Sequence, residues 1–447
     1  MKCLTWVVKG FPVYLMLLIY LPAGALGLLL LQDHSSFEFL VLLVVFAFTY
    51  FLTFNFFSNV YTVLVGNLKR TWRVPRQAWT SLALLALLSY IATLVCAAWI
   101  AESVPLLVAL KGGSLMDIAH SRSQFLAGLA GYESLLRYLA FILGRSVMPL
   151  ILVAAYMLRA RFRYWLLALL LGLSLLAMEK AAPIFVLLPL AFHYALGRRW
   201  SSLAGTLLIM VASIALLAFL AMGGNAKPSS TDASTAVAEL PMPALIVPPG
   251  LPIQEAMGDR LRSLLPYYLC NRFSDEKCQF DPNKLSAKLT LLLNRVGWIP
   301  YITAYDWLEF QRIVLEDRLT LGRSISFVHL LFGEPKMQLE KMVYVYEYGA
   351  SPGGEGASNT VFFVDAKLAF GWLGVIAYCL IFTFCAACIF TSGSRVLIVS
   401  SIVCFIVASV SSLTATLLSG GLFIYMVLSL LLGEADEAGA VGEDSSR

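Results

Sequence analysis

Residues 37–64, FEFLVLLVVFAFTYFLTFNFFSNVYTVL, contain a single charged side chain, Glu38, in a run of aromatic and aliphatic residues. A helix needs roughly 20 consecutive apolar residues to cross the hydrocarbon core of a bilayer, so this run is long enough to form a transmembrane helix. Comparable apolar runs cover residues 11–31, 82–100, 139–158, 165–178, 184–196, 203–222, 372–390, 396–413 and 415–432. The sequence therefore predicts an all-α, polytopic transmembrane bundle of about ten spans.

The composition is that of a membrane protein. Mean hydropathy is +0.81 and only 13% of the 447 residues are charged, whereas soluble domains have about 25% charged residues. The first run is not followed by a small-residue cleavage site and a soluble domain, so we expect it to be an ordinary span and not a signal peptide. Residues 165–178 and 184–196 are short, and we expect them to form a tightly turned helical hairpin.

Basic side chains in the short connections predict the orientation. One group comprises Lys69, Arg70, Arg73 and Arg76, a second Arg159, Arg161 and Arg163, a third Arg198 and Arg199, and Arg395 stands alone. These groups alternate with connections that are nearly uncharged, such as residues 32–36. Because connections rich in Lys and Arg stay on the cytoplasmic side, we expect both termini in the cytoplasm of a bacterial inner membrane protein.

This topology divides the chain into four predicted parts. They are an N-terminal transmembrane block (1–222), a large periplasmic loop (223–360), a C-terminal transmembrane block (361–432) and an acidic cytoplasmic tail (433–447). The periplasmic loop is the longest polar stretch of the chain. Its aromatic residues, among them Tyr301, Tyr305 and Trp307, are suited to the headgroup level of the bilayer.

Two of the eight cysteines differ from the rest in their surroundings. Cys270 and Cys278 lie in the predicted periplasmic loop, and in an oxidising compartment we expect them to form a short disulfide, with two free thiols as the alternative. Cys385 and Cys388 have a C-x-x-C spacing, but they lie inside an apolar run with no histidine nearby. We expect these two to be small core residues.

Arg145 lies inside the span predicted for residues 139–158. An arginine in hydrocarbon is costly and usually faces a bundle interior or a wet cavity. Arg145 is therefore either a binding residue for an anion, a structural partner of a carboxylate, or a side chain that snorkels to the outer interface. Glu179 and Lys180 are charged residues at the tip of the predicted hairpin, and their role also has two alternatives. They pair with each other, or they bind an anion where Lys180 begins a helix.

Further arginines are predicted on the external side, and they are Arg122, Arg295, Arg312, Arg318 and Arg323. A planar guanidinium binds phosphate in a bidentate manner. Several guanidinium groups beside one cavity would hold a pyrophosphate without a metal ion, whereas each one alone is expected to be a solvated surface residue.

Asp365 and His329 are the candidates for a general base. Asp365 follows a Gly- and Ser-rich turn at the mouth of a span, where burial would raise its pKa toward the working pH. The alternative is an ion pair of Asp365 with Lys367 or Arg145. His329 lies in an apolar run, so it is either a packed histidine or the next candidate base.

Several motifs are absent from the sequence. We find no P-loop, no G-x-S-x-G, no H-E-x-x-H, no zinc-ligand spacing and no D-x-D for a metal-bound sugar nucleotide. We therefore expect no metal and no cofactor. The net charge of +5 is explained by the basic cytoplasmic connections, and no basic, aromatic-interleaved module suggests nucleic-acid binding.

Three segments resemble bacterial O-antigen and capsule polymerases of the Wzy type, which join oligosaccharide repeat units. Residues 114–138 form an external segment with an arginine that leads into the span holding Arg145. Residues 178–182, MEKAA, resemble the family's small-residue turn, with Lys180 where the family usually has an arginine. Residues 358–374, SNTVFFVDAKLAFGWLG, resemble its polar, Asn-containing stretch before an aromatic-Gly-x-x-Gly helix start.

The resemblance implies a GT-C-like fold and a metal-independent glycosyltransferase on the periplasmic face. A sugar hydroxyl of one polyprenyl-pyrophosphate-linked oligosaccharide attacks the anomeric carbon of another, and polyprenyl pyrophosphate leaves. In this interpretation the substrate contacts are made by Arg145, Lys180, Arg122, Arg323, Glu179 and Asn359, and the base is Asp365 or His329. The partners are the lipid-linked substrate and the lipid bilayer, with or without a chain-length regulator protein.

Three alternatives remain. An O-antigen ligase would carry a His-Asn pair in the third segment, and Ser358 stands before Asn359 in its place, which favours a polymerase. A flippase for lipid-linked oligosaccharides would need charged groups through the bundle and roughly symmetric halves. A structural or assembly protein would not require Arg145 within a span.

Reporter fusions test the topology. Fusions after Arg76, Arg199 and Arg395 should report the cytoplasm, and a fusion near Ser230 should report the periplasm, because the basic connections alternate with uncharged ones. The opposite signal at two or more of these positions would overturn the topology.

Overall fold

The computed structural model describes residues 2–65, 76–101, 103–113, 115–125, 134–179, 181–222, 297–325, 328, 336–348 and 357–431. The regular structure within these ranges is helical, without a strand. Six helices there are long and apolar enough to cross a membrane, and they are Val8–Leu29, His34–Val65, Thr80–Ile100, Leu135–Met157, Trp200–Leu217 and Phe362–Thr391. Shorter apolar helices are Arg163–Leu176, Ala182–Leu196, Arg395–Ala408 and Leu422–Leu431. The all-α membrane class predicted from the sequence is confirmed.

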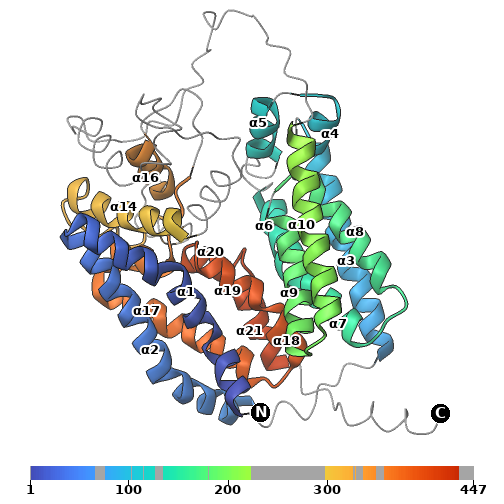
Figure 1. Ribbon diagram of the computed structural model, residues 1–447, viewed down its shortest axis with the longest axis horizontal. Coiled ribbons are helices and arrows are strands. Elements are labelled where there is room, and N and C mark those ends of the chain that lie inside the picture. Colours follow the sequence, from blue (N-terminus) through green and yellow to red (C-terminus); the bar gives the residue numbers. More distant parts are fainter. Residues whose placement is uncertain are drawn as a thin grey trace, which may run out of the picture. The chain divides into compact units, whose positions relative to one another are not determined.

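The described helices form two compact units, each built from separate stretches of the chain. Unit 1 draws on Met1–Thr53, Ser234–Thr383 and Ala408–Thr414, and unit 2 on Phe54–Ala233, Phe384–Val407 and Ala415–Arg447. The helices of unit 1 are α1 (Lys2–Leu31), α14 (Ile299–Ile313), α16 (Leu339–Tyr348) and the first parts of α2 (His34–Val65) and α17 (Phe362–Thr391) (Figure 1). Helices α2 and α17 continue into unit 2.

An aromatic cluster joins α2 and α17 in unit 1. Phe362 stacks on Phe382 with ring centroids 4.9 Å apart, and Phe46 stacks on Phe363 at 5.7 Å. All four rings are fully buried. In lipid no hydrophobic force drives helices together, so close packing of such side chains supplies the association.

Helix α17 is kinked at Gly371, whose φ of 66° and ψ of −155° lie in a region that glycine alone occupies readily. The kink frees the carbonyls of the preceding turn. The backbone N–H groups of Thr320 and Leu321 donate to the carbonyls of Leu368 and Ala369, both at 2.9 Å. The helix therefore begins at Phe362, ahead of the predicted start at residue 372, because a second chain segment stabilises the break.

Unit 2 holds the remaining described helices. They are α3 (Arg76–Ile100), α4 (Pro105–Leu110), α5 (Leu115–Phe125), α6 (Ser134–Ile142), α7 (Met148–Met157), α8 (Arg163–Leu176), α9 (Ala182–Leu196), α10 (Trp200–Met222), α18 (Arg395–Ser400) and α21 (Leu422–Leu431), with α19 (Ile402–Ala408) and α20 (Leu413–Leu417) shared with unit 1.

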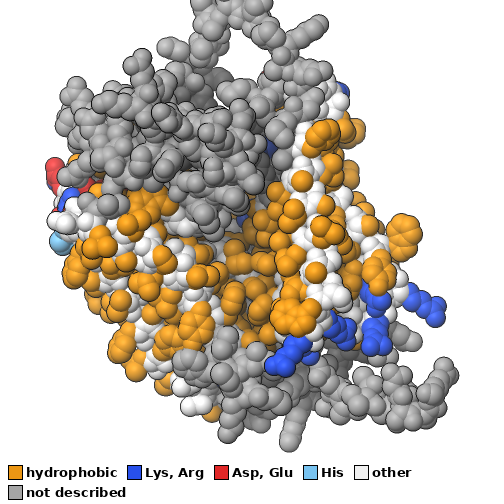
Figure 2. Space-filling view, in the orientation of Figure 1, with side chains coloured by type: hydrophobic (Ala, Val, Ile, Leu, Met, Phe, Trp, Pro, Cys, Tyr) orange, Lys and Arg blue, Asp and Glu red, His pale blue; other side chains and the backbone are white. Residues whose placement is uncertain are grey.

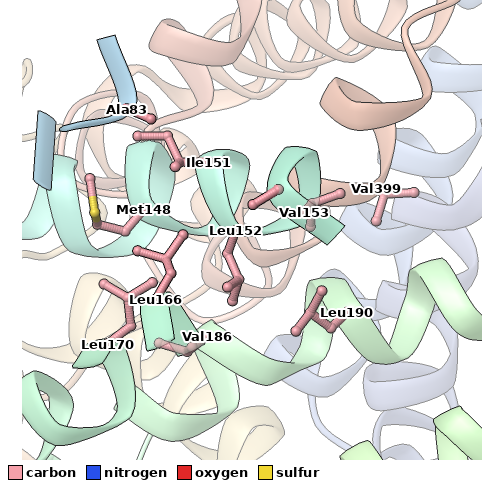
Figure 3. Close-up of a cluster of buried hydrophobic side chains, with 11 residues drawn as sticks. Ala83, Met148, Ile151, Leu152, Val153, Leu166, Leu170, Val186, Leu190 and Val399 are labelled. Carbon is pink, nitrogen blue, oxygen red and sulfur yellow. The ribbon is translucent and has the colours of Figure 1, made fainter. Parts of the chain in front are cut away.

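Helix α7 lies at the centre of unit 2. Figure 3 shows Ile151 turned toward Ala83 of α3, Val153 toward Val399 of α18, and Leu152 toward the side formed by α8 and α9. These side chains belong to one buried cluster. In contrast, α3 and α10 expose large apolar side chains, and Trp99 of α3 is 88% exposed. Hydrophobic side chains cover much of α10 in Figure 2. Such a surface is suited to lipid.

The basic turns of unit 2 gather at one end. Arg159 and Arg161 precede α8, Arg198 and Arg199 precede α10, and all four are exposed. The ring of Tyr156 at the end of α7 lies 6.5 Å from that of Tyr194 at the end of α9, which brings the two turns to the same end. Lys and Arg side chains are visible there in Figure 2.

The opposite end of unit 2 is formed by the tip of the α8–α9 hairpin. These helices have 14 and 15 residues, so they are about 21 and 22 Å long, which is less than the ~30 Å of a hydrocarbon core. Met178 at the tip packs with Ala109 of α4, Ile118 of α5 and Leu217 of α10. Helices α4 and α5 thus cover the hairpin tip.

Replacing Gly371 with alanine should destabilise the protein by about 1–3 kcal/mol, because an L-residue is strained in this conformation. The measurement is thermal unfolding in detergent. Gly172→Ala is the matched control, since α8 is regular there and a Cβ would have no atom within 4 Å. Equal unfolding temperatures for the two variants would contradict the role assigned to the kink.

Candidate functional site

Arg145 lies in a π-helical turn, Leu143–Val147, between α6 and α7. Such turns disturb the regular backbone hydrogen bonding and occur frequently at functional sites. The hydroxyl of Tyr425 in α21 donates to the carbonyl of Ser146 at 2.8 Å. Gly421 leaves the room for this contact, because a Cβ there would lie 1.5 Å from the Ser146 Oγ. The turn is therefore held in place by α21.

The guanidinium of Arg145 is held by aromatic rings and one carboxylate. Its central carbon lies 4.1 Å from the ring centre of Phe141 and 5.4 Å from that of Phe185. One of its nitrogens lies 3.4 Å from a carboxylate oxygen of Glu179. That distance is longer than the roughly 2.7–2.9 Å of a tight charge-assisted hydrogen bond. Of the alternatives predicted for Arg145, the structure thus contains the ion pair with a carboxylate, and the partner is Glu179.

A cavity of about 60 Å³ lies beside this pair, with room for a few water molecules. Its polar lining comes from Tyr90, Arg145, Ser174 and Glu179, and the other lining residues are Leu, Ala, Phe, Val and one Gly. The cavity lies at the hairpin tip, at the end of unit 2 opposite the basic turns. Arg145 is the one cation among the described lining residues, and a cation in an apolar recess is suited to the anionic head of a lipid-like ligand.

Unit 1 contains a second group of ionisable residues. Asp306 and Glu309 of α14 are each 2% exposed, and Glu347 of α16 is 9% exposed. The negative charges of Glu347 and Glu309 both act on Asp306. Three carboxyl groups are therefore gathered in the interior of unit 1.

Hydrogen bonds hold two of these carboxyl groups. The hydroxyl of Ser358 donates to Glu347 Oε1 at 2.6 Å. Glu309 Oε1 accepts from Ser35 at 2.5 Å and from Arg312 at 2.6 Å. Within the described part of the chain, Glu347 Oε2 is buried without a hydrogen-bond partner. Such an oxygen is costly unless it carries a proton or meets a ligand.

Burial raises the pKa values of two of these carboxyl groups. It raises the pKa of Glu347 to about 8, although the hydrogen bond from Ser358 acts in the opposite direction. Burial and the nearby charges of Glu347 and Glu309 raise the pKa of Asp306 well above its usual range. Two carboxyl groups that interact in this way titrate as a pair, so the pair retains protons near neutral pH.

Asp33, at the start of α2, has a pKa below its usual value. Burial would raise its pKa, but hydrogen bonds from Tyr305 and Ser36 and the charge of Arg312 lower it overall. Tyr305 donates to Asp33 at 2.5 Å. Tyr301, Tyr305 and Trp307 are buried within unit 1 and do not form the exposed belt expected at the headgroup level.

Asp365 is 4% exposed in the first turn of α17. Lys367 pairs with Glu38 at 2.8 Å, so the predicted alternative of an Asp365–Lys367 pair is wrong. The charge of Glu340 acts on Asp365. Asp365 is therefore a buried carboxyl in an acidic neighbourhood of unit 1.

The other predicted site residues are dispersed. Arg122 is exposed in the last turn of α5 in unit 2, at the same end as the hairpin tip. Arg323 and Asn359 belong to unit 1, where Asn359 is exposed beside the buried Ser358. Lys180, His329, Cys270 and Cys278 lie outside the described residues.

Asp306, Glu309 and Glu347 are missing from the residues predicted from the sequence. One signal for the first two is their spacing, since residues three apart share a helix face and this face also carries aromatic side chains. Glu347 has no such signal, because it reaches α14 only through the tertiary packing of α16.

Within the described residues, no group of three or more His, Cys, Asp or Glu side chains has the arrangement of a metal site. Comparisons of the chain with protein families, with curated proteins and with solved structures find no match.

Glu347→Gln should reduce the pH dependence of stability. The folded protein holds the Glu347 proton up to about pH 8, whereas the unfolded chain releases it near the usual value of 4.5, so stability falls as the pH rises through this window. Such a shift corresponds to at most about 5 kcal/mol. Thermal unfolding in detergent at the two ends of the window measures the fall, which should be smaller in the variant.

Glu316→Gln is the matched control, because the Glu316 side chain is 73% exposed. The control should show the same fall in stability as the unmodified protein. An equally steep fall in Glu347→Gln would contradict the raised pKa.

Proposed function

We propose that the chain is a membrane glycosyltransferase that joins polyprenyl-pyrophosphate-linked oligosaccharide repeat units into a surface polysaccharide. A hydroxyl of the acceptor glycan forms a new bond to the anomeric carbon of the donor. The bond from that carbon to the pyrophosphate oxygen breaks, and the electron pair leaves with polyprenyl pyrophosphate. The hydroxyl proton passes to a carboxylate or to water. The proposal requires no metal and no cofactor.

The observation that carries the proposal is the loose pairing of Arg145 in an apolar recess. The guanidinium is oriented by Phe141 and Phe185, yet its contact with Glu179 is 3.4 Å long. A guanidinium has five N–H donors and binds phosphate through two parallel hydrogen bonds. Charge develops on the leaving pyrophosphate during the reaction, and a fixed cation beside it stabilises that charge.

The arrangement of unit 2 supports a periplasmic site. The basic turns lie at one end of α7, α8 and α9, and Arg145 lies at the other. If the basic turns are cytoplasmic, Arg145 is near the periplasmic side, where lipid-linked glycans would be joined. Six long and four shorter apolar helices fit the proposed ten-span, GT-C-like bundle with both termini in the cytoplasm and multiple passes of the inner membrane.

A flippase for the same lipid-linked oligosaccharide is the second candidate. It is favoured by the buried carboxyl groups of unit 1, because groups with raised pKa values can take up and release protons near neutral pH. The candidate functions have different consequences in a strain that lacks the chain. Loss of a polymerase leaves single repeats on the surface, loss of a flippase leaves none, and loss of a ligase leaves polymer that is not attached.

Arg145→Ala should abolish polymer formation while the protein remains in the membrane. Arg145→Lys should restore it only in part, since an ammonium cannot replace a bidentate guanidinium. The measurement is the size distribution of surface glycan after complementation of the deletion strain, and of the product made by purified protein from a lipid-linked repeat unit.

Arg163→Ala is the matched control. Arg163 also stacks on two rings, those of Tyr156 and Tyr164, but it lies at the basic end of unit 2. The Arg163→Ala variant should leave polymer length unchanged. Normal polymer from Arg145→Ala would make Arg145 a structural residue and remove the basis of the proposal.

A further inference from the structure

Tyr90 of α3 contributes the one phenolic hydroxyl to the described lining of the Arg145 cavity. Its ring packs among the apolar residues of unit 2, including those around α7. The hydroxyl oxygen would lie 2.9 Å from a Cβ built on Gly144, so the polar end of the side chain lies beside the π-helical turn that carries Arg145.

Tyr90 lines the same cavity as Arg145 and Glu179. It interacts electrostatically with Glu179 and with Arg145. The described structure nevertheless shows no hydrogen bond from this hydroxyl, although a hydroxyl in an apolar cavity usually has a partner. An O–H donor beside a guanidinium, in a recess of Leu, Ala, Phe and Val, is suited to an oxygen of an anion with an apolar tail.

Glu179 occupies the position of such an anion. It lies in the short turn after α8, preceded by Met178 with a φ of 48°, and its side chain is one third exposed. Its carboxylate oxygen is at the guanidinium of Arg145, where a phosphate oxygen would bind. Because Glu179 stands on a turn and not within a helix, its side chain can withdraw without disturbing α8 or α9.

We propose that Tyr90 and Arg145 together bind one phosphate group of an isoprenoid pyrophosphate, and that Glu179 is a built-in competitor that closes the empty site. The inference rests on the proposed function and adds to it a second donor and a displaceable carboxylate. When the ligand enters, its phosphate accepts from both donors, and Glu179 moves away because like charges repel. When the ligand leaves, Glu179 again neutralises Arg145.

Binding of farnesyl pyrophosphate to the purified full-length protein in detergent tests the role of Tyr90. Tyr90→Phe removes one oxygen and keeps the ring, so it should weaken binding about tenfold, as expected for a lost hydrogen bond to a charged group. Tyr156→Phe is the matched control, since it removes the same atom at the basic end of unit 2, and it should bind as the unmodified protein does.

Replacing Glu179 should have the opposite effect on the binding of farnesyl pyrophosphate. Glu179→Gln keeps the shape and removes the competing charge, so it should strengthen binding about threefold, in line with the small energy of a partly exposed ion pair. Weaker binding in this variant would overturn the competitor role and make Glu179 part of the binding site.

Further probes separate the ligand sources and the two proposals. Inorganic pyrophosphate and farnesol should each bind more weakly than farnesyl pyrophosphate, and equal binding of inorganic pyrophosphate would overturn the isoprenoid assignment. If Arg145→Ala abolishes binding while Tyr90→Phe binds normally, the role of Tyr90 alone is refuted. If Arg145→Ala binds farnesyl pyrophosphate as well as the unmodified protein does, the proposed function loses its basis as well.

Discussion

Backbone groups inside a bilayer have no water to bond with, so every break in a helix must be repaired by the protein itself. In unit 2 the π-helical turn that carries Arg145 is repaired by the hydroxyl of Tyr425, which donates to the carbonyl of Ser146. In unit 1 the kink at Gly371 is repaired by backbone N–H groups of residues 320–321. Each repair comes from a segment distant in sequence. The positions of the side chains in the two candidate sites therefore depend on tertiary packing and not on helix propensity.

The two units handle buried charge in different ways. In unit 2 a cation meets one carboxylate at a loose distance, and aromatic rings supply the rest of its surroundings. In unit 1 the gathered carboxyl groups outnumber the nearby cations, and the raised pKa values of Glu347 and Asp306 let this pair retain protons near neutral pH. The first arrangement is suited to an incoming anion, because the cation can exchange its partner. The second is suited to holding and releasing protons.

The sequence predicts the helices well, because an uninterrupted apolar run has few alternatives in a chain with so few charges. It also identifies Arg145, since a lone intramembrane charge stands out against its neighbours. It does not predict the early start of α17, because the bonds that stabilise residues before Gly371 come from another segment. The gathering of Asp306 and Glu347 is equally hidden, since each alone resembles a solvated surface acid. The pattern of residues along the sequence does not show which distant segments are in contact.

The shortness of the α8–α9 hairpin has a consequence for how a long-tailed lipid would approach. The wall of unit 2 is built there from two pieces, the hairpin below and the α4–α5 cap above. The two pieces pack together at Met178, about 21 Å from the basic end, which is still within the ~30 Å of hydrocarbon. A headgroup that entered sideways between them would meet Glu179 while its apolar tail stayed among the acyl chains. Lateral entry of this kind spares the roughly 0.8 kcal/mol that each CH₂ would cost if the tail were drawn into water.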